Sequence, residues 1–138
     1  MARKVSGRNN PDMEKLFVYG TLQSSELMHR LLGRLPPSCP ALLHGYARYA
    51  VKNEDFPGLV PETEASTNGL LYENLSDKEL ARLDQYESEM YDRPCLEVHL
   101  ASGETCEAHV YVVSPDYRHL LDDSSWDLKS WPPPQNIT

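Results

Sequence analysis

Two acidic residues near the middle of the chain, Asp84 and Glu87, are the first candidates for chemistry. Leu80 and Leu83 mark the apolar stripe of a predicted helix that opens at Ser76. At about 100° per residue, Glu87 falls roughly 20° and Asp84 roughly 40° from the direction of Leu80. We therefore expect both carboxylates to point inward, where burial raises a carboxyl pKa towards neutrality and suits proton transfer.

The same pattern leaves an ordinary alternative for Glu87. A carboxylate at a helix end can be a solvated charge, or it can pair with Arg82 or Arg93. A helix that stops before residue 87 would also move this side chain off the apolar stripe. Glu87 is thus the candidate acid or base, with these alternatives open.

The segment Tyr19-Gly20-Thr21-Leu22 is the second candidate. It ends a short β-branched and aromatic run, and a helical pattern follows almost at once. A strand that stops at a glycine turn before a helix exposes backbone N–H groups, which can hold an anion or an oxyanion. Glycine also marks many purely structural turns, so the segment alone is consistent with a simple strand exit.

Two helices are expected to position these residues. Ser24 or Ser25 can cap the first, which runs to about Leu32 before Gly33 ends it. The second begins with the capping box of residues 76–79 and runs to about residue 86. Prolines at 36, 37 and 40 predict a loop after the first helix.

Period-two patterns and turn signals predict five or six strands. A strand at 16–19 precedes the glycine turn, and a turn is expected at 55–58. The other expected strands are 41–51, a short piece at 59–61, 67–74, 95–101 and 105–113. Together with two main helices they indicate an α+β fold, in which a small mixed or antiparallel sheet closes into a β-barrel with flanking helices.

The register of the last hairpin can be argued from its apolar faces. A three-residue loop, 102–104, with Gly103 at positive φ places Val98 opposite Ala108 on the apolar face. It also places His99 opposite Glu107 and His109 opposite Glu97, so both histidines are expected to be surface cross-strand partners. Cys95 and Cys106 then lie on opposite faces and cannot form a disulfide.

Length and composition set broad limits. The chain has 138 residues and a formal net charge of −8, which argues against non-specific nucleic-acid binding. We expect a flexible tail at 1–13, a single domain at 14–131 and a flexible tail at 132–138, with Trp126 and Trp131 packed on the body. The oligomeric state is not readable from the sequence.

The sequence offers no signal for export, a membrane or a metal. No apolar stretch reaches the roughly 20 residues that cross a bilayer, and no apolar segment follows the basic residues near the N-terminus. We therefore expect a cytoplasmic protein. Three cysteines, Cys39, Cys95 and Cys106, have no metal-ligand spacing and are expected to be free thiols, with no cofactor.

An ordered set of short motifs resembles the γ-glutamylcyclotransferase-like family, whose plant members are called avirulence-induced-gene-like proteins. The resemblance covers roughly residues 15–131. It rests on YGTL at 19–22, FPGLVP at 56–61, GLLY at 69–72, LDxYE at 83–87 and YxR at 91–93. Each motif is weak, but their order and spacing are fairly specific.

The resemblance implies a fold and a reaction. Family members are small α+β barrels with a central pocket, where the loop matching Tyr19–Leu22 binds the γ-glutamyl group. The glutamate matching Glu87 is the acid/base. The substrate's α-amine attacks its own γ-carbonyl and releases 5-oxoproline and an amine, so intramolecular geometry supplies much of the rate. Such an enzyme is of the acyltransferase or lyase type. Alternatives are a γ-glutamylamine cyclotransferase, a non-catalytic ligand-binding relative, or a structural module.

Three further positions belong to this interpretation. Tyr19 could add a hydroxyl to the pocket or simply pack in its wall. Tyr91 and Arg93 could close the rim, although a salt bridge is at least as good an account of Arg93. Many family members have glycine where this chain has Ser88, and a positive φ there would cost serine about 1 kcal/mol.

Overall fold

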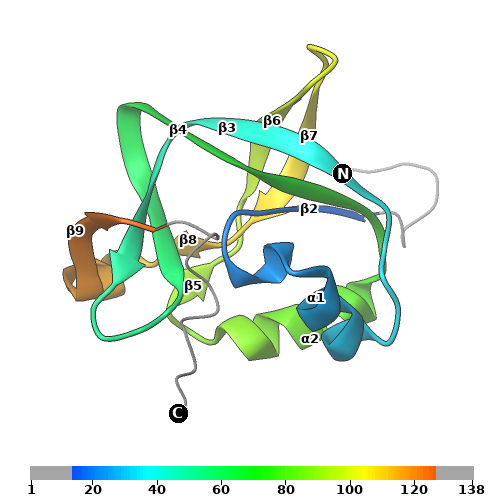
Figure 1. Ribbon diagram of the computed structural model, residues 1–138, viewed down its shortest axis with the longest axis horizontal. Helices are drawn as coiled ribbons and strands as arrows, with labels where there is room; N and C mark the ends of the chain where they lie inside the picture. The colour runs from blue at the N-terminus through cyan, green and yellow to red at the C-terminus, as the bar shows by residue number, and fades with distance from the viewer. Residues whose placement is uncertain (1–13, 127–138) are drawn as a thin grey trace.

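The computed structural model describes residues 14–126 (Figure 1). The expected tails, and Trp131, lie outside the described residues. In chain order the elements are β2 (Glu14–Val18), a 3₁₀ turn (Thr21–Gln23), α1 (Ser25–Leu32), β3 (Ser38–Val51), β4 (Pro57–Leu75), α2 (Asp77–Glu87), β5 (Tyr91–Asp92), β6 (Cys95–Leu100), β7 (Thr105–Val110), β8 (Val112–Val113), a 3₁₀ helix (Pro115–Leu120) and β9 (Leu121–Ser125).

The main sheet closes on itself as a five-stranded mixed barrel, which confirms the expected fold class. Its strand order is β4-β2-β7-β6-β3, and β3 pairs again with β4 to complete the ring. Only the β2–β7 pairing in this ring is parallel. Strand β9 adds to β3, and β5 pairs with β8 in a separate small sheet. The glycine turn after β2 therefore leaves from a strand inside the closed ring.

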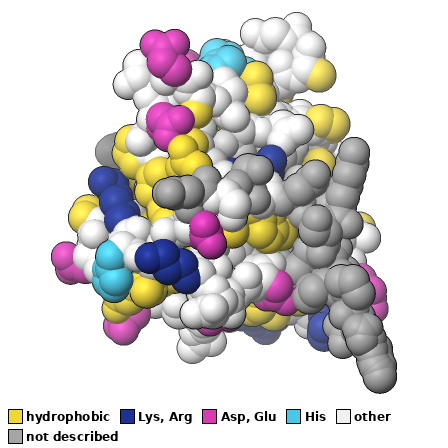
Figure 2. Space-filling model, turned by 60° about the vertical axis from the view of Figure 1, so that its left-hand side comes forward, with side chains coloured by type: hydrophobic (Ala, Val, Ile, Leu, Met, Phe, Trp, Pro, Cys, Tyr) yellow, Lys and Arg dark blue, Asp and Glu magenta, His cyan; other side chains and the backbone are white. Residues whose placement is uncertain are grey.

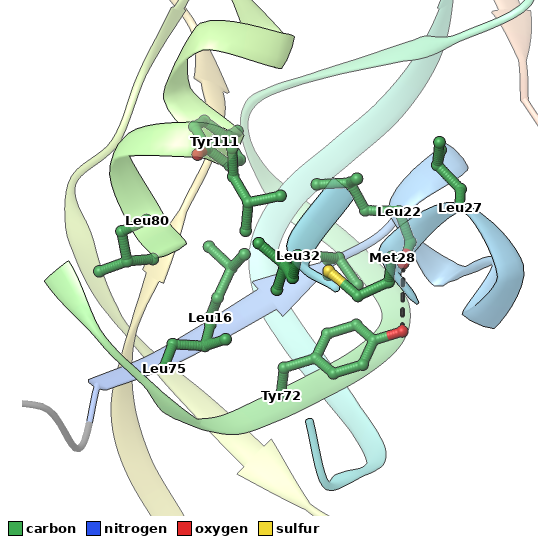
Figure 3. Packing of buried hydrophobic residues seen from close by; sticks show 11 residues of the cluster. Leu16, Leu22, Leu27, Met28, Leu32, Tyr72, Leu75, Leu80 and Tyr111 are labelled. Atoms are coloured by element: carbon green, nitrogen blue, oxygen red, sulfur yellow. Dashed lines mark hydrogen bonds between the residues drawn. The ribbon is translucent and has the colours of Figure 1, made fainter. Parts of the chain in front are cut away.

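Helices α1 and α2 lie together against one side of the barrel (Figure 1). Apolar side chains from both helices and from β2 and β4 meet there in one buried cluster (Figure 3). Tyr72 contributes its ring to the cluster and donates its hydroxyl to the carbonyl of Leu22 at 3.2 Å. This bond fixes the turn after β2 to strand β4.

The barrel interior is a second apolar cluster. It contains the fully buried ring of Phe17 from β2 together with Leu43, Leu59, Leu71 and Val98 from the surrounding strands. Barrel and helix clusters share strand β2, which alternates Phe17 inward with Leu16 and Val18 towards the helices. The two cores together hold the end of β2 in place on both faces.

Strands β3 and β4 are longer than expected. The pieces predicted at 59–61 and 67–74 are joined in one strand, β4, because residues 62–65 stay extended while bulging opposite Gly45. Gly45 has φ +86°, which lets β3 bend at this point. The loop expected through Pro40 is also wrong, since Pro40 lies in β3. Pro40 pairs there with Leu70 of β4 and has no partner in β6. The strand therefore tolerates a residue that lacks a backbone N–H at this position.

The predicted register of the β6–β7 hairpin is wrong. The loop begins one residue earlier than predicted, so each β6 residue pairs with the β7 residue two positions before the predicted one. Val98 lies opposite Cys106, and Glu97 opposite Glu107. The loop has three residues, but it is 101–103, because Gly103 at φ +95° takes the last loop position, where a left-handed residue follows a type I turn. The apolar faces are unaffected, and all three cysteines are free, as expected.

The C-terminal part has more regular structure than expected. The strand predicted at 105–113 divides into β7 and β8, and β8 pairs with β5, an element that the sequence analysis missed. Trp126 is buried, as predicted, and its indole N–H donates to the carbonyl of Asp55 at 3.0 Å. This contact secures the β3–β4 turn beside residues 56 and 57.

Within residues 14–126, no helix is long and apolar enough to cross a membrane. The face shown in Figure 2 carries acidic and basic side chains interspersed with apolar ones. No extended basic patch is seen on that face.

The capping box of α2 is formed as predicted and offers a test of how this helix is held. The Ser76 hydroxyl accepts from the N–H of Glu79 at 3.1 Å, and the Glu79 carboxylate accepts from the N–H of Ser76 at 3.0 Å. Replacing Ser76 with Ala should lower the free energy of unfolding by about 1 kcal/mol, measured by urea titration. Ser25→Ala, at an exposed position beside the Ser24 cap of α1, is the control and should cost less. Equal losses would contradict the assigned cap.

Candidate functional site

A pocket lies where β2, the start of β4, the end of α2 and β5 meet. Tyr19, Gly20, Thr21 and Leu22 line it together with Glu87, so the structure brings all five sequence-predicted site residues together. Its inner end is narrow, about 20 Å³, which suits a single water-sized atom. It adjoins a wider outer part of about 220 Å³, and both parts share Thr21, Phe56, Glu87 and Tyr91.

The turn after β2 forms one wall of the pocket. Residues Thr21–Gln23 make a single 3₁₀ turn, so the N–H groups of Thr21 and Leu22 have no acceptor within that turn. Gly20 is required for close packing, since a Cβ there would lie 2.7 Å from Cγ of Pro57. The Tyr86 hydroxyl and the Thr21 hydroxyl are 3.3 Å apart and join this turn to the end of α2.

Glu87 is the last residue of α2 and its side chain is partly buried in the pocket. Its carboxylate makes no hydrogen bond or ion pair with any described residue. Burial raises the pKa of Glu87 to about 7, and the negative charge of Asp84 adds to this shift. Of the alternatives for Glu87, pairing with arginine is wrong, because Arg82 donates to the Leu32 carbonyl and Arg93 pairs with Asp84.

Asp84 lies one turn before Glu87 and has the opposite character. Its carboxylate accepts from Arg93 Nε at 2.8 Å and Nη2 at 3.0 Å, and from the Tyr111 hydroxyl at 2.7 Å. Burial works against the charged form, but the bonds from Arg93 and Tyr111 outweigh it and lower the pKa of Asp84. The two acids are therefore set apart, Asp84 as a fixed anion and Glu87 as a group that titrates near neutrality.

Three tyrosines line the inner end. The Tyr19 hydroxyl donates to the Tyr111 carbonyl, so this side chain packs in the wall with its hydroxyl engaged. Tyr91 donates to the Pro57 carbonyl at 2.7 Å, and its ring meets that of Tyr111 edge to face. Burial raises the pKa of all three hydroxyls, which stay protonated at neutral pH.

Several positions differ from expectation. Arg93 does not line the pocket; it lies on the other side of Asp84 in a salt bridge. His109 is no surface partner of Glu97, since its Nε2 contacts Glu14 at 2.9 Å and its Nδ1 contacts Arg93 at 2.8 Å. His99 lies opposite Thr105, and its ring contacts His44. Both histidines have partners other than the predicted ones because the hairpin loop begins one residue earlier than predicted.

Sequence reasoning missed Tyr111, Pro57 and Phe56 as pocket residues. Tyr111 lies in the short break between β7 and β8, within a stretch that the sequence pattern predicts as one continuous strand. Phe56 and Pro57 belong to a predicted turn and to the FPGLVP motif of the resemblance, neither of which assigns them to a pocket. Within the described part of the chain, no group of three or more His, Cys, Asp or Glu residues is arranged to hold a metal ion.

Ser88 follows Glu87 with φ +74° and ψ −179°, a region that is essentially confined to glycine. Its N–H still donates to the Asp84 carbonyl at 3.0 Å, so this residue ends the helix in a strained conformation. The departure from the family's glycine therefore falls at a position that does require positive φ.

Comparison with known proteins identifies relatives over most of the chain. The sequence model of the family described as "Gamma-glutamyl cyclotransferase, AIG2-like" matches residues 16–131. AIG2-like protein C of Arabidopsis thaliana is 35% identical over 118 residues, which cover 84% of this chain and 67% of the relative.

Solved structures agree with the fold. An Arabidopsis thaliana protein determined in solution superposes with a TM-score of 0.71 at 29% identity, covering 91% of this chain and 76% of the other. A gamma-glutamyl cyclotransferase superposes with a TM-score of 0.62 at 16% identity, covering 76% of this chain and 73% of the other. The latter likeness concerns the fold alone.

The strained backbone at Ser88 gives a direct test of the pocket's geometry. Ser88→Gly should raise the free energy of unfolding by about 1 kcal/mol, because glycine adopts this conformation without a Cβ clash. Asn53→Gly, at an exposed residue with φ 64°, is the matched control and should gain less, since asparagine tolerates that region. A loss of stability in Ser88→Gly, measured by urea titration, would contradict the strain.

Proposed function

Because this chain belongs to the AIG2-like gamma-glutamyl cyclotransferase family, we propose that its pocket converts a γ-glutamyl amide into 5-oxoproline and a free amine or amino acid. The observation that carries the proposal is the partly buried, unpaired carboxylate of Glu87 opposite the Gly20–Leu22 turn. This reaction makes the enzyme an acyltransferase or lyase acting on a small γ-glutamyl molecule.

Glu87 acts twice in this account. Its carboxylate takes a proton from the substrate's α-ammonium group, and the freed amine attacks the γ-carbonyl carbon to close a five-membered ring. The protonated Glu87 then gives its proton to the amide nitrogen as the carbon–nitrogen bond breaks. The ring nitrogen gives up its second proton to the departing amine, which leaves as an ammonium ion. The substrate supplies its own nucleophile, so atoms balance without water. A pKa of about 7 suits both proton transfers.

The turn after β2 stabilises the charge that develops on the γ-carbonyl oxygen. The backbone N–H groups of Gly20–Leu22 hold this oxyanion or the substrate carboxylate. The narrow inner end of the pocket, with room for about one water-sized atom, supports a site for a single oxygen. Tyr19 and Tyr72 hold the turn from both sides through their bonds to main-chain carbonyls.

Glu87→Gln is the central test. The variant should fold and lose activity by a factor of about 10² to 10⁴, measured as 5-oxoproline released from a panel of γ-glutamyl amides. Glu89→Gln, an exposed acid two residues on, is the matched control and should keep most of the activity. Retained turnover in Glu87→Gln would refute its role. Release of no 5-oxoproline by folded wild-type protein would favour a ligand-binding relative that kept only the pocket.

The raised pKa of Glu87 also predicts two pH dependences. Because the base must be ionised, kcat/KM should rise with pH through a midpoint near 7. Stability should show the reverse, since a carboxyl with a raised native pKa is destabilising once ionised. That penalty is absent below the ordinary value of 4.5 and complete above about 7. At pH 8, Glu87→Gln should therefore unfold at higher urea than wild type. A lower midpoint would contradict the burial of this charge.

The outer part of the pocket favours a second candidate, a γ-glutamylamine cyclotransferase. Phe56, Tyr86 and Met90 line this part, and Glu87 is the only charged side chain among the described residues that do so. An amino-acid leaving group carries a carboxylate beside the scissile nitrogen, and therefore close to Glu87. No basic side chain of the described lining offsets that repulsion, so an amine is the better leaving group.

A matched pair of substrates tests this preference. γ-Glutamylphenethylamine and γ-glutamylphenylalanine differ only in the carboxylate of the leaving group. We expect kcat/KM to be about tenfold higher for the amine. Tyr86→Arg should narrow the ratio by placing a cation at the mouth, whereas Gln85→Arg, exposed on the same helix and outside the lining, should not. A preference for the amino acid in wild type would exclude the amine assignment.

A further inference from the structure

A network of polar contacts lies outside the pocket and ends at Asp84 of α2. Glu14 contacts His109 Nε2 at 2.9 Å, and His109 Nδ1 accepts from Arg93 Nη1 at 2.8 Å. Arg93 holds both oxygens of Asp84, and Tyr111 donates to one of them. The network thus joins β2, β7, the segment between β5 and β6, helix α2 and the residue between β7 and β8.

The contacts fix which nitrogen of His109 carries the proton in this network. Arg93 can only donate, so His109 Nδ1 must accept and its proton lies on Nε2, which donates to Glu14. Each of the three Arg93 nitrogens therefore donates to an acceptor, two of them to the Asp84 carboxylate. A cleft of about 270 Å³, lined among others by Glu14, Asp84, Arg93 and His109, opens beside it.

Asp84 connects this polar network to the pocket. It lies three residues before Glu87, so both side chains project from one face of α2. Tyr111 stands between the two sides, since its ring lines the pocket while its hydroxyl donates to Asp84. Asp84 and Arg93 themselves line neither part of the pocket. They can act on the reaction only through Tyr111 and Glu87.

We propose that Asp84, clamped by Arg93, is a positioning residue for Glu87: it holds Tyr111 against the pocket and keeps a fixed negative charge behind the catalytic carboxylate. This inference rests on the proposed function. The groups that face Glu87 are Asp84 on its own helix, Tyr86 beside it, and Tyr19, Tyr91 and Tyr111 from the barrel side. Burial raises the pKa of Tyr19, Tyr91 and Tyr111, which are neutral near pH 7, so Asp84 is the charge that matters, and Arg93 sets how strongly it is felt.

Two substitutions that should shift the titration midpoint of Glu87 in opposite directions test the proposal on the folded protein. Asp84→Asn removes the negative charge, so the titration midpoint of Glu87 should fall by about one pH unit. Arg93→Gln leaves Asp84 without its counter-charge, so the midpoint should rise. The measurement is ¹³C NMR titration of the Glu87 side-chain carboxyl, identified by its absence in Glu87→Gln. It needs no substrate and no turnover.

Arg34→Gln is the matched control. Arg34 makes a similar two-point contact with Glu79 on the same helix, at 2.7 and 2.8 Å, but two turns away from Glu87. It should alter stability without moving the Glu87 midpoint. If Asp84→Asn does not fold, Arg93→Gln carries the test alone, because Tyr111 still donates to Asp84. Midpoints that stay at the wild-type value, or that move in the same direction in both variants, would overturn the proposal.

Activity separates this inference from the proposed function. In an active enzyme, kcat should fall in both variants with little change in KM, and the pH midpoint of kcat/KM should follow the NMR shifts. Opposite NMR shifts in a protein that releases no 5-oxoproline would leave the inference standing and remove the function. An active enzyme in which neither substitution moves the Glu87 titration midpoint would keep the proposed function and overturn the inference. If the Asp84–Arg93 ion pair were purely structural, both substitutions would lower stability, as is expected of Arg34→Gln, without either shift.

Discussion

The site depends on one carboxylate that is partly removed from water and has no described partner. Glu87 meets neither arginine nor a hydrogen-bond donor among the described residues, and its pKa is raised to about 7 by burial. Such a group costs stability unless it is used, because ionisation in a poorly solvated place is unfavourable. The fold keeps it there by ending α2 at this residue, with the strained Ser88 following and Asp84 one turn before.

The closed barrel supplies what stands opposite Glu87. Strand β2 is held within the ring by β4 and β7, and it delivers the Gly20 turn to a fixed place. Pro57 packs against Gly20 so closely that no side chain fits between them, and Tyr72 ties the turn to β4. Glu87 and the Gly20–Leu22 turn thus line the same narrow pocket. That arrangement suits a reaction in which the substrate supplies its own nucleophile.

Local signals predicted the elements well, and long-range geometry decided what they missed. The capping box at Ser76 and the Gly33 stop are local, and both are formed as expected. The role of Arg93 depends on where α2 lies relative to the chain after β5, which no local pattern encodes. His109 was misplaced because Gly103 occupies the last loop position and not the middle one, which shifts every cross-strand pair. Tyr111 was hidden because the break between β7 and β8 has no glycine or proline to mark it.

The most direct measurement is the fate of the γ-glutamyl group in water enriched in ¹⁸O. Mass spectrometry of the products from wild-type protein and a γ-glutamyl amide distinguishes attack by the substrate's amine from attack by water. Cyclisation by the substrate's amine should give 5-oxoproline without excess ¹⁸O, released together with the amine. Glutamate carrying one ¹⁸O atom would show that water is the nucleophile and would contradict intramolecular cyclisation at Glu87.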